Sequence, residues 1–338
     1  MQESQEAVPG ISSPRAEPLL RAEELRTWFA VGSGVFSQPL HVRAVDGVSL
    51  TLFRGRTTAL VGESGCGKTT LGRTFLRLLE PTSGRLLYDG HDITHLKQRD
   101  LRWFRRKAQL VPQDPYSSLN PMLPIHRILE EPLLVHGMKR EERGKVILQA
   151  LEDVHLIPPE GFAKKYPHML SGGQRQRVAV ARALILEPEL VIADEPVSML
   201  DASVRVSVLN LLGDLQRKYD ISFIYITHDM ATAKHFSDFI AVMYAGEIVE
   251  IGPTKKVIAE PLHPYTQALI EALPDPDPDN RLRDRPAIPG EPPSLVNPPE
   301  GCRFHPRCPI ARSGLCDVER PLSRELRPGH LVQCHLAE

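Results

Sequence analysis

The sequence predicts an α/β fold that is built on a mostly parallel sheet. Between about residues 19 and 260, short β-branched and aliphatic runs alternate with longer helical runs. Residues 190–193 are all apolar, which is typical of a strand that is buried on both faces. Residues 57–61 form another short strand run, and a glycine-rich turn and a helical segment over 69–79 follow it. Further expected elements are a strand over 221–227 and a helix over 201–219 that Asp201 would cap.

The composition excludes several classes of protein. Lys and Arg number 41 and Asp and Glu number 42, so the formal net charge is −1. A protein whose main partner is nucleic acid needs a strong basic excess, so we expect no such partner. No stretch approaches the roughly 18 apolar residues of a membrane span, and the first 20 residues lack the apolar core of a signal peptide. We therefore expect a soluble, cytoplasmic protein that reaches a membrane only through a partner.

Changes in composition predict the domain boundaries. Residues 1–18 are polar and contain three prolines, so we expect a flexible tail. Residues 19–260 form the α/β domain, in which residues from about 123 to 183 read as a mostly helical subdomain. Residues 261–338 begin as a connector, because nine prolines occur between 274 and 299 and no helix or central strand tolerates that density. The connector leads to a small cysteine-rich C-terminal domain.

Residues 62–69, which we call the P-loop, match the phosphate-binding pattern G-x-x-x-x-G-K-[ST] and lie between a strand and a helix. Glycines let backbone N–H groups surround a phosphate, and the N-terminus of the helix adds partial positive charge. Lys68 would reach the β- and γ-phosphates, and the Thr69 hydroxyl would bind Mg²⁺. The alternative is a chance glycine-rich turn. The nucleotide-binding residues expected here are Gly62, Glu63, Ser64, Gly65, Cys66, Gly67, Lys68, Thr69 and Thr70.

Cys66 lies at the N-terminus of the predicted helix over 69–79. A thiol in that position can have a lowered pKa, which would make it reactive. The alternative is that Cys66 is only a small residue that fits the loop.

Two acidic residues, Asp194 and Glu195, follow the apolar run of residues 190–193. Open α/β sheets bind ligands at the carboxyl ends of their strands. Asp194 is therefore placed to hold Mg²⁺ through water, and Glu195 is placed to polarise an attacking water. The alternative is a pair of solvated charges at a strand end.

Residues 170–174, Leu-Ser-Gly-Gly-Gln, form a second candidate anion site before a helix over 175–186. Ser171 is of a type that caps helices, and Gly172 and Gly173 expose backbone N–H groups. A capped turn without a ligand is the alternative, although a single P-loop does not need a second anion site.

Together with the P-loop and Asp194-Glu195, residues 170–174 resemble the motifs of the ATP-binding cassette (ABC) ATPases, and the resemblance covers nearly the whole chain. We call residues 170–174 the signature loop. The resemblance implies a RecA-like parallel core, an antiparallel β subdomain and a helical subdomain. It also implies that Gln113 senses the γ-phosphate and helps to bind Mg²⁺, and that His228 is the switch histidine.

Two further features follow from the same resemblance. Residues 198–201 resemble the D-loop, with Met199 where alanine is usual. An aromatic residue upstream of Val45 would stack on adenine, and Phe36 is the candidate.

Two nucleotide-binding domains of this family associate head to tail, so that the signature loop of one covers the ATP held by the P-loop of the other. The resemblance therefore implies that this chain acts in a dimer. Lys68, Gln113, Glu195 and His228 would act at the chain's own site, whereas Ser171, Gly172, Gly173 and Gln174 would complete the partner's site.

Further strings are similar to the ATPases of oligopeptide and dipeptide importers, most of all to the second of the two paralogous ATPases of a dipeptide importer. They cover residues 44–49, 61–68, 115–121, 263–269 and 298–302. The resemblance implies an enzyme that couples hydrolysis of ATP to ADP and phosphate with peptide import. Its partners would be a paralogous ATPase, two transmembrane permease subunits and an external peptide-binding protein, and it would lie on the cytoplasmic face of the cell membrane.

Several alternatives stay open at this point. The substrate could be a dipeptide, an oligopeptide, a nickel complex or glutathione, and the ATPases could form a homodimer or a heterodimer. A soluble ABC ATPase outside transport and a cassette that binds ATP without hydrolysing it are the competing functions, although Glu195 and His228 argue against the latter.

Four of the five cysteines lie close to the C-terminus, with the spacing Cys302-x5-Cys308-x7-Cys316-x17-Cys334. Without an export signal, such a group favours a metal site over disulfides, and it lacks the paired C-x2–4-C knuckles of structural zinc. The resemblance implies the C-terminal extension of peptide-importer ATPases, which carries a [4Fe–4S] cluster on four cysteines. Zinc and an unmetallated or disulfide state stay open as alternatives, because four thiolates suit either metal.

Three histidines lie near these cysteines in the sequence, but four thiolates already complete a metal site. We therefore expect His305, His330 and His335 at the surface. Nothing in the sequence places the C-terminal cysteines near Lys68 or Glu195.

Overall fold

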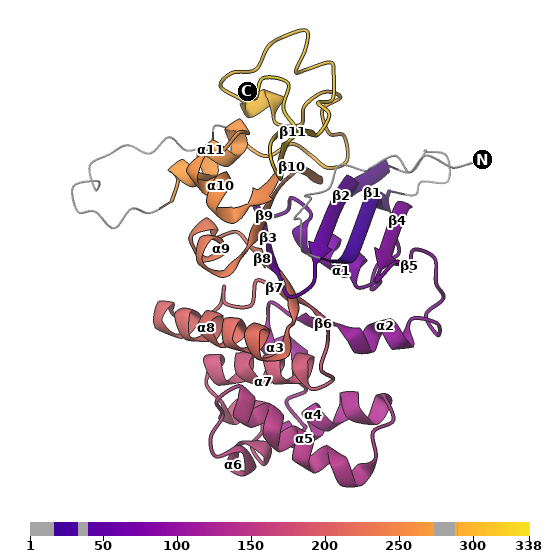
Figure 1. The fold of residues 1–338 in the computed structure, drawn as a ribbon, viewed down its shortest axis with the longest axis vertical. Helices are drawn as coiled ribbons and strands as arrows, with labels where there is room; N and C mark the ends of the chain where they lie inside the picture. The colour runs from indigo at the N-terminus through magenta and orange to yellow at the C-terminus, as the bar shows by residue number, and fades with distance from the viewer. Residues whose placement is uncertain (1–16, 33–39, 274–287, 289) are drawn as a thin grey trace, which may run out of the picture. The chain divides into compact units, whose positions relative to one another are not determined.

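The computed structural model describes residues 17–32, 40–273, 288 and 290–338 (Figure 1). These residues form two compact units, which are considered one at a time. The first unit comprises the described residues up to Phe53, Thr57–His95 and Thr227–Glu338, and the second comprises Arg54–Arg56 and Leu96–Ile226. Phe36 and residues 1–16 of the expected tail lie outside the described residues.

The first unit contains an antiparallel sheet with the strand order β2-β1-β4-β5. The side chains of Leu20, Ala22 and Leu25 in the first strand are buried, and a register shift between Ala22 and Leu25 bends it. This sheet is the antiparallel β subdomain that the family resemblance implied. Its strands are β1 (Pro18–Val31), β2 (Leu40–Phe53), β4 (Ser83–Tyr88) and β5 (His91–Asp92).

A second group of strands in the first unit has the order β11-β12-β10-β9-β3. The predicted strand β3 (Thr57–Val61) is buried along its whole length and pairs in parallel with β9 (Phe239–Tyr244). The remaining pairs are antiparallel. The other elements of this unit are β10 (Glu247–Pro253), β11 (Arg324–Arg327), β12 (His330–Val332), α1 (Lys68–Phe75), α9 (Met230–Phe236), α10 (Thr254–Ala259), α11 (Pro264–Glu271) and the 3₁₀ helix η3 (His305–Arg307).

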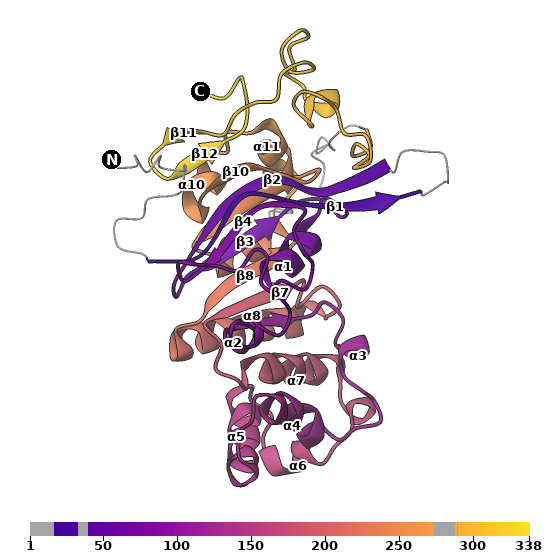
Figure 2. The ribbon, with the colours of Figure 1, turned by 90° about the vertical axis from the view of Figure 1, so that its right-hand side faces the viewer.

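The C-terminal segment adds its own strands to this sheet, because β12 pairs with β10. Figures 1 and 2 show the segment, in yellow, beside β10 and α11. Helix α11 occupies the start of the expected connector. Pro264 is tolerated there because it stands in the first turn, where its missing N–H is not needed, and His263 Nδ1 accepts a hydrogen bond from the Tyr265 N–H over 3.0 Å.

The second unit contains the parallel strands β8-β7-β6 and most of the helices. All five residues of β7 (Leu190–Asp194) are buried, as the apolar run predicted. Between β6 (Ala108–Val111) and β7 the structure contains helices only, and α4, α5 and α6 gather beside α7 (Figure 1). The helices and the third strand are α2 (Arg102–Lys107), α3 (Pro115–Ser118), α4 (Ile125–Val135), α5 (Arg140–Asp153), α6 (Pro159–Ala163), η1 (Pro167–Met169), α7 (Gly172–Leu184), α8 (Ala202–Tyr219) and β8 (Ser222–Thr227, whose last residue belongs to the first unit).

Three predicted helices differ slightly from the observed ones. Helix α1 ends at Phe75, before the expected residue 79, because Arg77 has a left-handed backbone with φ +53°. Helix α7 begins at Gly172, three residues early, because Ser171 already caps it. Asp201 stands at the N-cap position of α8 but its side chain makes no capping hydrogen bond.

Within the described residues, no helix combines the length and the apolar character that crossing a membrane requires.

Candidate nucleotide-binding site

The P-loop connects β3 to α1, and two of its glycines are required by close backbone contacts. A Cβ atom at Gly62 would lie 2.1 Å from the carbonyl oxygen of Met243, and one at Gly67 would lie 2.0 Å from that of Ala44. Gly67 also has φ +107°, a backbone conformation that residues with a side chain rarely adopt. The loop is therefore packed against β2 and the end of β9 and has little freedom to change shape.

Lys68 is buried and its ammonium group lies inside the loop. Its Nζ donates hydrogen bonds to the carbonyl oxygens of Gly62 and Glu63, each over 2.8 Å. These bonds hold the first two residues of the loop around the cation. Thr69 and Thr70 follow in the first turn of α1, as the motif predicted.

Cys66 is a buried thiol in the middle of the P-loop. Burial raises its pKa, and the nearby Lys68 ammonium opposes that effect only in part. The thiol therefore stays protonated at neutral pH, and of the two sequence interpretations the structure favours the small loop residue over the reactive thiol.

His228 begins the loop after β8. The neighbouring Asp229 caps α9: its Oδ1 accepts hydrogen bonds from the N–H groups of Ala231 over 2.9 Å and Thr232 over 3.4 Å. The Asp229 N–H also donates to Thr227 Oγ1 over 3.0 Å. His228 is thus held between a strand end and a capped helix.

In the second unit, Gln113 and Glu195 lie side by side although 82 residues separate them. Strands β6 and β7 pair in parallel, with Val111 opposite Ala193, so their carboxyl ends meet at one edge. Gln113 Nε2 donates a hydrogen bond to Glu195 Oε2 over 3.1 Å. The structure therefore places the Gln113 amide against the Glu195 carboxylate at the carboxyl ends of β6 and β7.

Glu195 has a left-handed backbone, with φ +44°. Its N–H donates to the Ile226 carbonyl over 3.0 Å, which fixes the turn after β7. Non-glycine residues in this region cost about 1–3 kcal/mol and gather at functional sites. Asp194, the residue before, is buried at the end of β7.

The signature loop forms a complete capping box on α7. Ser171 Oγ accepts a hydrogen bond from the Gln174 N–H over 3.3 Å, and Gln174 Oε1 accepts one from the Ser171 N–H over 3.1 Å. A Cβ atom at Gly173 would lie 2.5 Å from Val204 Cγ1, so this glycine is required by packing against α8. Gly172 has no contact of that kind, since its nearest atom would be 3.7 Å away.

The expected site residues divide between the two units. The P-loop and His228 belong to the first unit, whereas Gln113, Asp194, Glu195 and the signature loop belong to the second.

The four C-terminal cysteines are free thiols. Burial and, to a smaller extent, the other three cysteines raise the pKa of the Cys302 thiol to about 12. Two backbone N–H groups donate to sulfur, from Arg312 to Cys316 Sγ and from Leu336 to Cys334 Sγ, each over 3.4 Å. In the described part of the chain, no three His, Cys, Asp or Glu side chains are grouped closely enough to hold a metal ion.

One expectation about this segment was wrong. His330 is fully buried, and its Nε2 lies 2.7 Å from Glu250 Oε1, because β12 places its first residue against β10. The segment also reaches the P-loop. The Arg307 guanidinium, next to Cys308, pairs with the Glu63 carboxylate over 2.8 and 3.1 Å.

Sequence reasoning missed two residues that contact the P-loop, Arg307 and Tyr265. The Tyr265 hydroxyl accepts a hydrogen bond from the Glu63 N–H over 2.9 Å. Tyr265 lies in a string that resembles peptide-importer ATPases, and Arg307 precedes a candidate metal ligand. Neither residue carried a signal that pointed to the nucleotide site.

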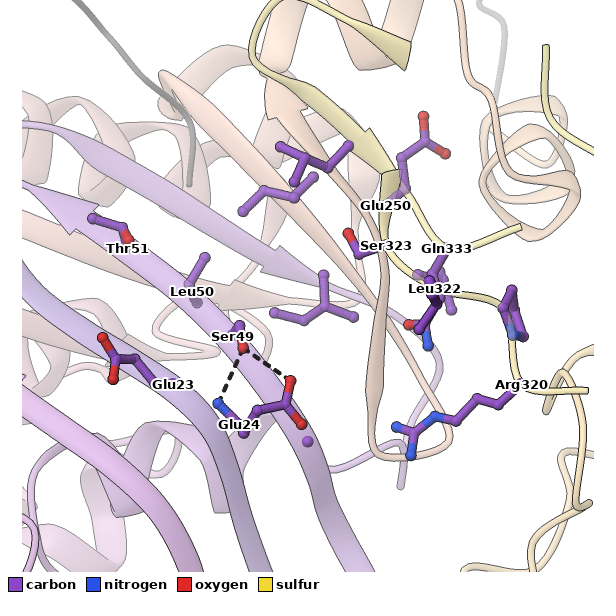
Figure 3. A pocket seen from close by; sticks show the side chains of 16 residues that line it. Glu23, Glu24, Ser49, Leu50, Thr51, Glu250, Arg320, Leu322, Ser323 and Gln333 are labelled. Carbon is purple, nitrogen blue, oxygen red and sulfur yellow. Dashed lines mark hydrogen bonds between the residues drawn. The ribbon is translucent and has the colours of Figure 1, made fainter. Parts of the chain in front are cut away.

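A pocket of about 460 Å³ lies elsewhere in the first unit, between β1, β2, β10 and the residues around Arg320 (Figure 3). At one side of it the Ser49 hydroxyl accepts a hydrogen bond from the Glu24 N–H over 3.0 Å and donates to the Glu24 carboxylate over 3.3 Å. No P-loop residue lines this pocket.

The chain matches the family described as ABC transporter over residues 45–198 and the family described as oligopeptide/dipeptide transporter, C-terminal region, over residues 249–316. It is 43% identical over 330 residues to the oligopeptide transport ATP-binding protein AppF of Bacillus subtilis, covering 96% of this chain and 99% of the relative. It is 46% identical to the dipeptide transport ATP-binding proteins DppF of Haemophilus influenzae (94% and 96% covered) and Escherichia coli (94% and 94% covered).

Solved structures show the same fold. A match at TM-score 0.62 and 30% identity is cbiO1 from Clostridium perfringens, described as part of an ABC transporter complex, with 72% of this chain and 91% of that chain covered. Another, at the same TM-score and identity, is the ATP-binding cassette MJ0796 as a dimer bound to ADP and Pi, with 70% and 99% covered.

Proposed function

The chain belongs to the ATP-binding cassette transporter family, and from that premise we propose that it is the ATP-hydrolysing subunit of an importer for dipeptides or oligopeptides. The second family match and the names of the relatives support a peptide as substrate over nickel or glutathione. The observation that carries the hydrolytic role is the contact of Gln113 with Glu195, beside Asp194 at the end of β7.

Each residue of the site would act on a defined part of the reaction. Water attacks the γ-phosphorus of ATP, Glu195 accepts a proton from that water, and the bond from phosphorus to the β–γ bridging oxygen breaks to give ADP and phosphate. The Lys68 ammonium neutralises charge on the β- and γ-phosphates. Gln113 orients Glu195, and His228 would contact the γ-phosphate from the end of β8.

Mg²⁺ would be held by Thr69, Gln113 and Asp194. These residues offer hydroxyl, amide and carboxylate oxygens, which are the ligands that Mg²⁺ prefers, and Gln113 directs its amide nitrogen at Glu195 so that its oxygen can face a cation. Bound Mg²⁺ would neutralise charge on the phosphates and orient them.

The signature loop would complete the site of a partner ATPase. The capping box of Ser171 and Gln174 fixes the N-terminus of α7, which offers N–H groups and partial positive charge to a phosphate. The solved cassette dimer bound to ADP and Pi supports an assembly of two such chains. In a mixed dimer, Ser171→Arg in this chain should block photolabelling and hydrolysis at the partner's P-loop. If photolabelling and hydrolysis were lost only at this chain's own P-loop, the assignment of the signature loop to the partner's site would be wrong.

The remaining partners would be two transmembrane permease subunits and an external peptide-binding protein, with a paralogous ATPase as the second nucleotide-binding chain. The relatives are named as transport ATP-binding proteins, which supports membrane partners. The chain would then lie on the cytoplasmic face of the cell membrane, where ATP is available.

We also propose that Cys302, Cys308, Cys316 and Cys334 hold a [4Fe–4S] cluster. Four free thiols and two N–H···S hydrogen bonds supply the donor types of such clusters. The described side chains are not grouped closely enough to hold a metal ion, so the four thiols would have to come together around the cluster. Protein purified without oxygen should be brown with about four irons per chain, and replacing any one cysteine by serine should bleach it. Colourless protein that contains one zinc per chain would show that the four cysteines form a zinc site instead. Protein that contains neither metal would refute both the cluster and the zinc site.

The transport function is tested by uptake. Cells that lack this chain are complemented with the wild type or with Lys68→Ala, and uptake of labelled dipeptide, pentapeptide, nickel and glutathione is measured. The wild type should restore peptide uptake and Lys68→Ala should not. Restored uptake of nickel or glutathione alone would assign the chain to that substrate instead.

A further inference from the structure

Glu63 directly follows Gly62 in the P-loop, and its N–H, its carbonyl and its carboxylate all make hydrogen bonds. Its N–H donates to the Tyr265 hydroxyl over 2.9 Å, and its carbonyl accepts from Lys68 Nζ over 2.8 Å. Its carboxylate accepts two hydrogen bonds from Arg307, over 2.8 and 3.1 Å. The residue is thus fixed on one side by the catalytic lysine and on the other by two residues from the C-terminal part of the chain.

Arg307 is well anchored for this contact. Only 7% of the residue is exposed, and its guanidinium lies over the Tyr244 ring at 5.8 Å from the centroid and donates to the Tyr244 hydroxyl over 3.3 Å. The two bonds to Glu63 have the parallel, bidentate form in which arginine and carboxylate interact most strongly. An exposed arginine would lose much of this energy to water and to side-chain entropy.

An aromatic cluster supports both residues that reach Glu63. The Tyr244 ring lies 4.6 Å from the Tyr265 ring and 5.2 Å from the Phe304 ring, and the Tyr265 and Phe304 rings are 5.4 Å apart. All three side chains are buried, and they come from β9, α11 and the turn before η3. The cluster therefore joins the end of a core strand to the C-terminal segment at the P-loop.

The charge of Glu63 makes this contact important for a nucleotide. A carboxylate one residue after Gly62 would repel the polyphosphate of ATP unless a cation neutralised it. Arg307 supplies that cation from the side of the carboxylate, and Lys68 remains available to the phosphates.

We propose that Arg307 is a positioning residue of the ATP site, which neutralises Glu63 and fixes the P-loop in the shape that receives the phosphates. This inference rests on the proposed ATPase function and extends it to a residue of the C-terminal region. Arg307 contacts neither the nucleotide nor the reacting atoms. It acts through Glu63.

The test is a double-mutant cycle on MgATP binding by the full chain, measured with a fluorescent ATP analogue. Arg307→Gln leaves the Glu63 carboxylate unpaired, so we expect the Kd to rise about tenfold, as for the loss of a charge-assisted hydrogen bond. Adding Glu63→Gln removes the unpaired charge, so the double variant should bind within about threefold of the wild type. Recovered affinity in the double variant would identify the unpaired charge as the cause, because two substitutions that each damaged the structure would raise the Kd further instead of restoring it.

Three further variants make the result decisive. Arg320→Gln removes another arginine of the same segment, which pairs with Glu247 over 2.9 Å and does not touch Glu63, so its Kd should equal that of the wild type. Arg307→Lys keeps the charge without the bidentate contact and should fall between the wild type and Arg307→Gln. If Arg307→Gln fails to fold, Arg307→Lys alone and combined with Glu63→Gln gives the same comparison.

The outcomes separate this inference from the function on which it rests. If Lys68→Ala abolishes binding while Arg307→Gln binds as tightly as the wild type, or if the double variant is weaker than Arg307→Gln, the positioning role is refuted and the ATPase function stands. An equal weakening by Arg320→Gln would also refute it. If Lys68→Ala binds MgATP normally, the proposed function itself fails.

Discussion

Glutamine in place of Glu195 would remove one proton acceptor and change little else in the second unit. The two side chains have the same length, and the amide oxygen can still accept the hydrogen bond that Gln113 donates over 3.1 Å. The backbone bond from the Glu195 N–H to the Ile226 carbonyl does not depend on the side chain. We therefore expect Glu195→Gln to fold, to bind MgATP like the wild type and to accumulate in the ATP-bound state.

Hydrolysis should fall because an amide cannot accept a proton from the attacking water. General-base catalysis contributes about 10²–10⁴ in rate. At 1.36 kcal/mol for each factor of ten, the activation free energy should rise by roughly 2.7–5.4 kcal/mol.

The assay is phosphate release by the complex assembled with its partner subunits, at saturating MgATP. Glu189→Gln is the matched control, because Glu189 precedes the same strand at its opposite end, where it pairs with Arg54 over 3.0 Å and Lys107 over 2.7 Å. That variant should hydrolyse ATP at the rate of the wild type. Turnover of Glu195→Gln within threefold of the wild type would show that another group accepts the proton.

Other predictions concern the packing and the pH dependence of the first unit. Gly67→Ala should abolish nucleotide binding or folding, because its Cβ would overlap a carbonyl oxygen. Gly65→Ala, whose Cβ would have no atom within 4 Å, should lower the free energy of unfolding by only about 1–2 kcal/mol for its left-handed backbone. Titrations with MgATP and thermal unfolding compare the two variants. Arg303→Met removes the buried cation shared by Asp46 and Glu247, which keep only their contacts with the more exposed Arg26 and Arg320, and should destabilise the unit by about 1–3 kcal/mol, measured as a lower Tm. Burial lowers the pKa of His263 from 6.5 to about 4. Between these two pH values the imidazole binds a proton in the unfolded chain but not in the folded one, so stability should fall as the pH falls through that window. A His263→Gln variant whose Tm falls just as steeply would contradict this.

The parts of the site that the sequence predicted are those in which neighbouring residues act together. The P-loop, the strand before Asp194 and the cap of α7 each depend on contiguous residues, and the structure contains all three as expected. The contact of Gln113 with Glu195 was not predicted, because it arises only when β6 and β7 pair; Gln113 was singled out by the family resemblance alone.

Residues that act across long separations were beyond sequence reasoning. Arg307 lies 244 residues from Glu63, and nothing in its immediate neighbours distinguishes it from a surface arginine. His330 was misplaced for the same reason, since its burial depends on the pairing of β12 with β10 and on the distant carboxylate of Glu250. Helix ends differed where one residue adopted a left-handed backbone, as at Arg77, which no pattern of apolar residues signals.

The short C-terminal strands also have a consequence for solubility. Without β12, one edge of β10 would offer unpaired backbone groups along a mostly buried strand, and such edges promote pairing between molecules. The new edge that β11 presents is only four residues long and carries Arg324, Glu325 and Arg327, a length and charge that discourage further strand addition. A chain that ends at residue 316 should therefore form aggregates through β10, even where its ATP site is intact.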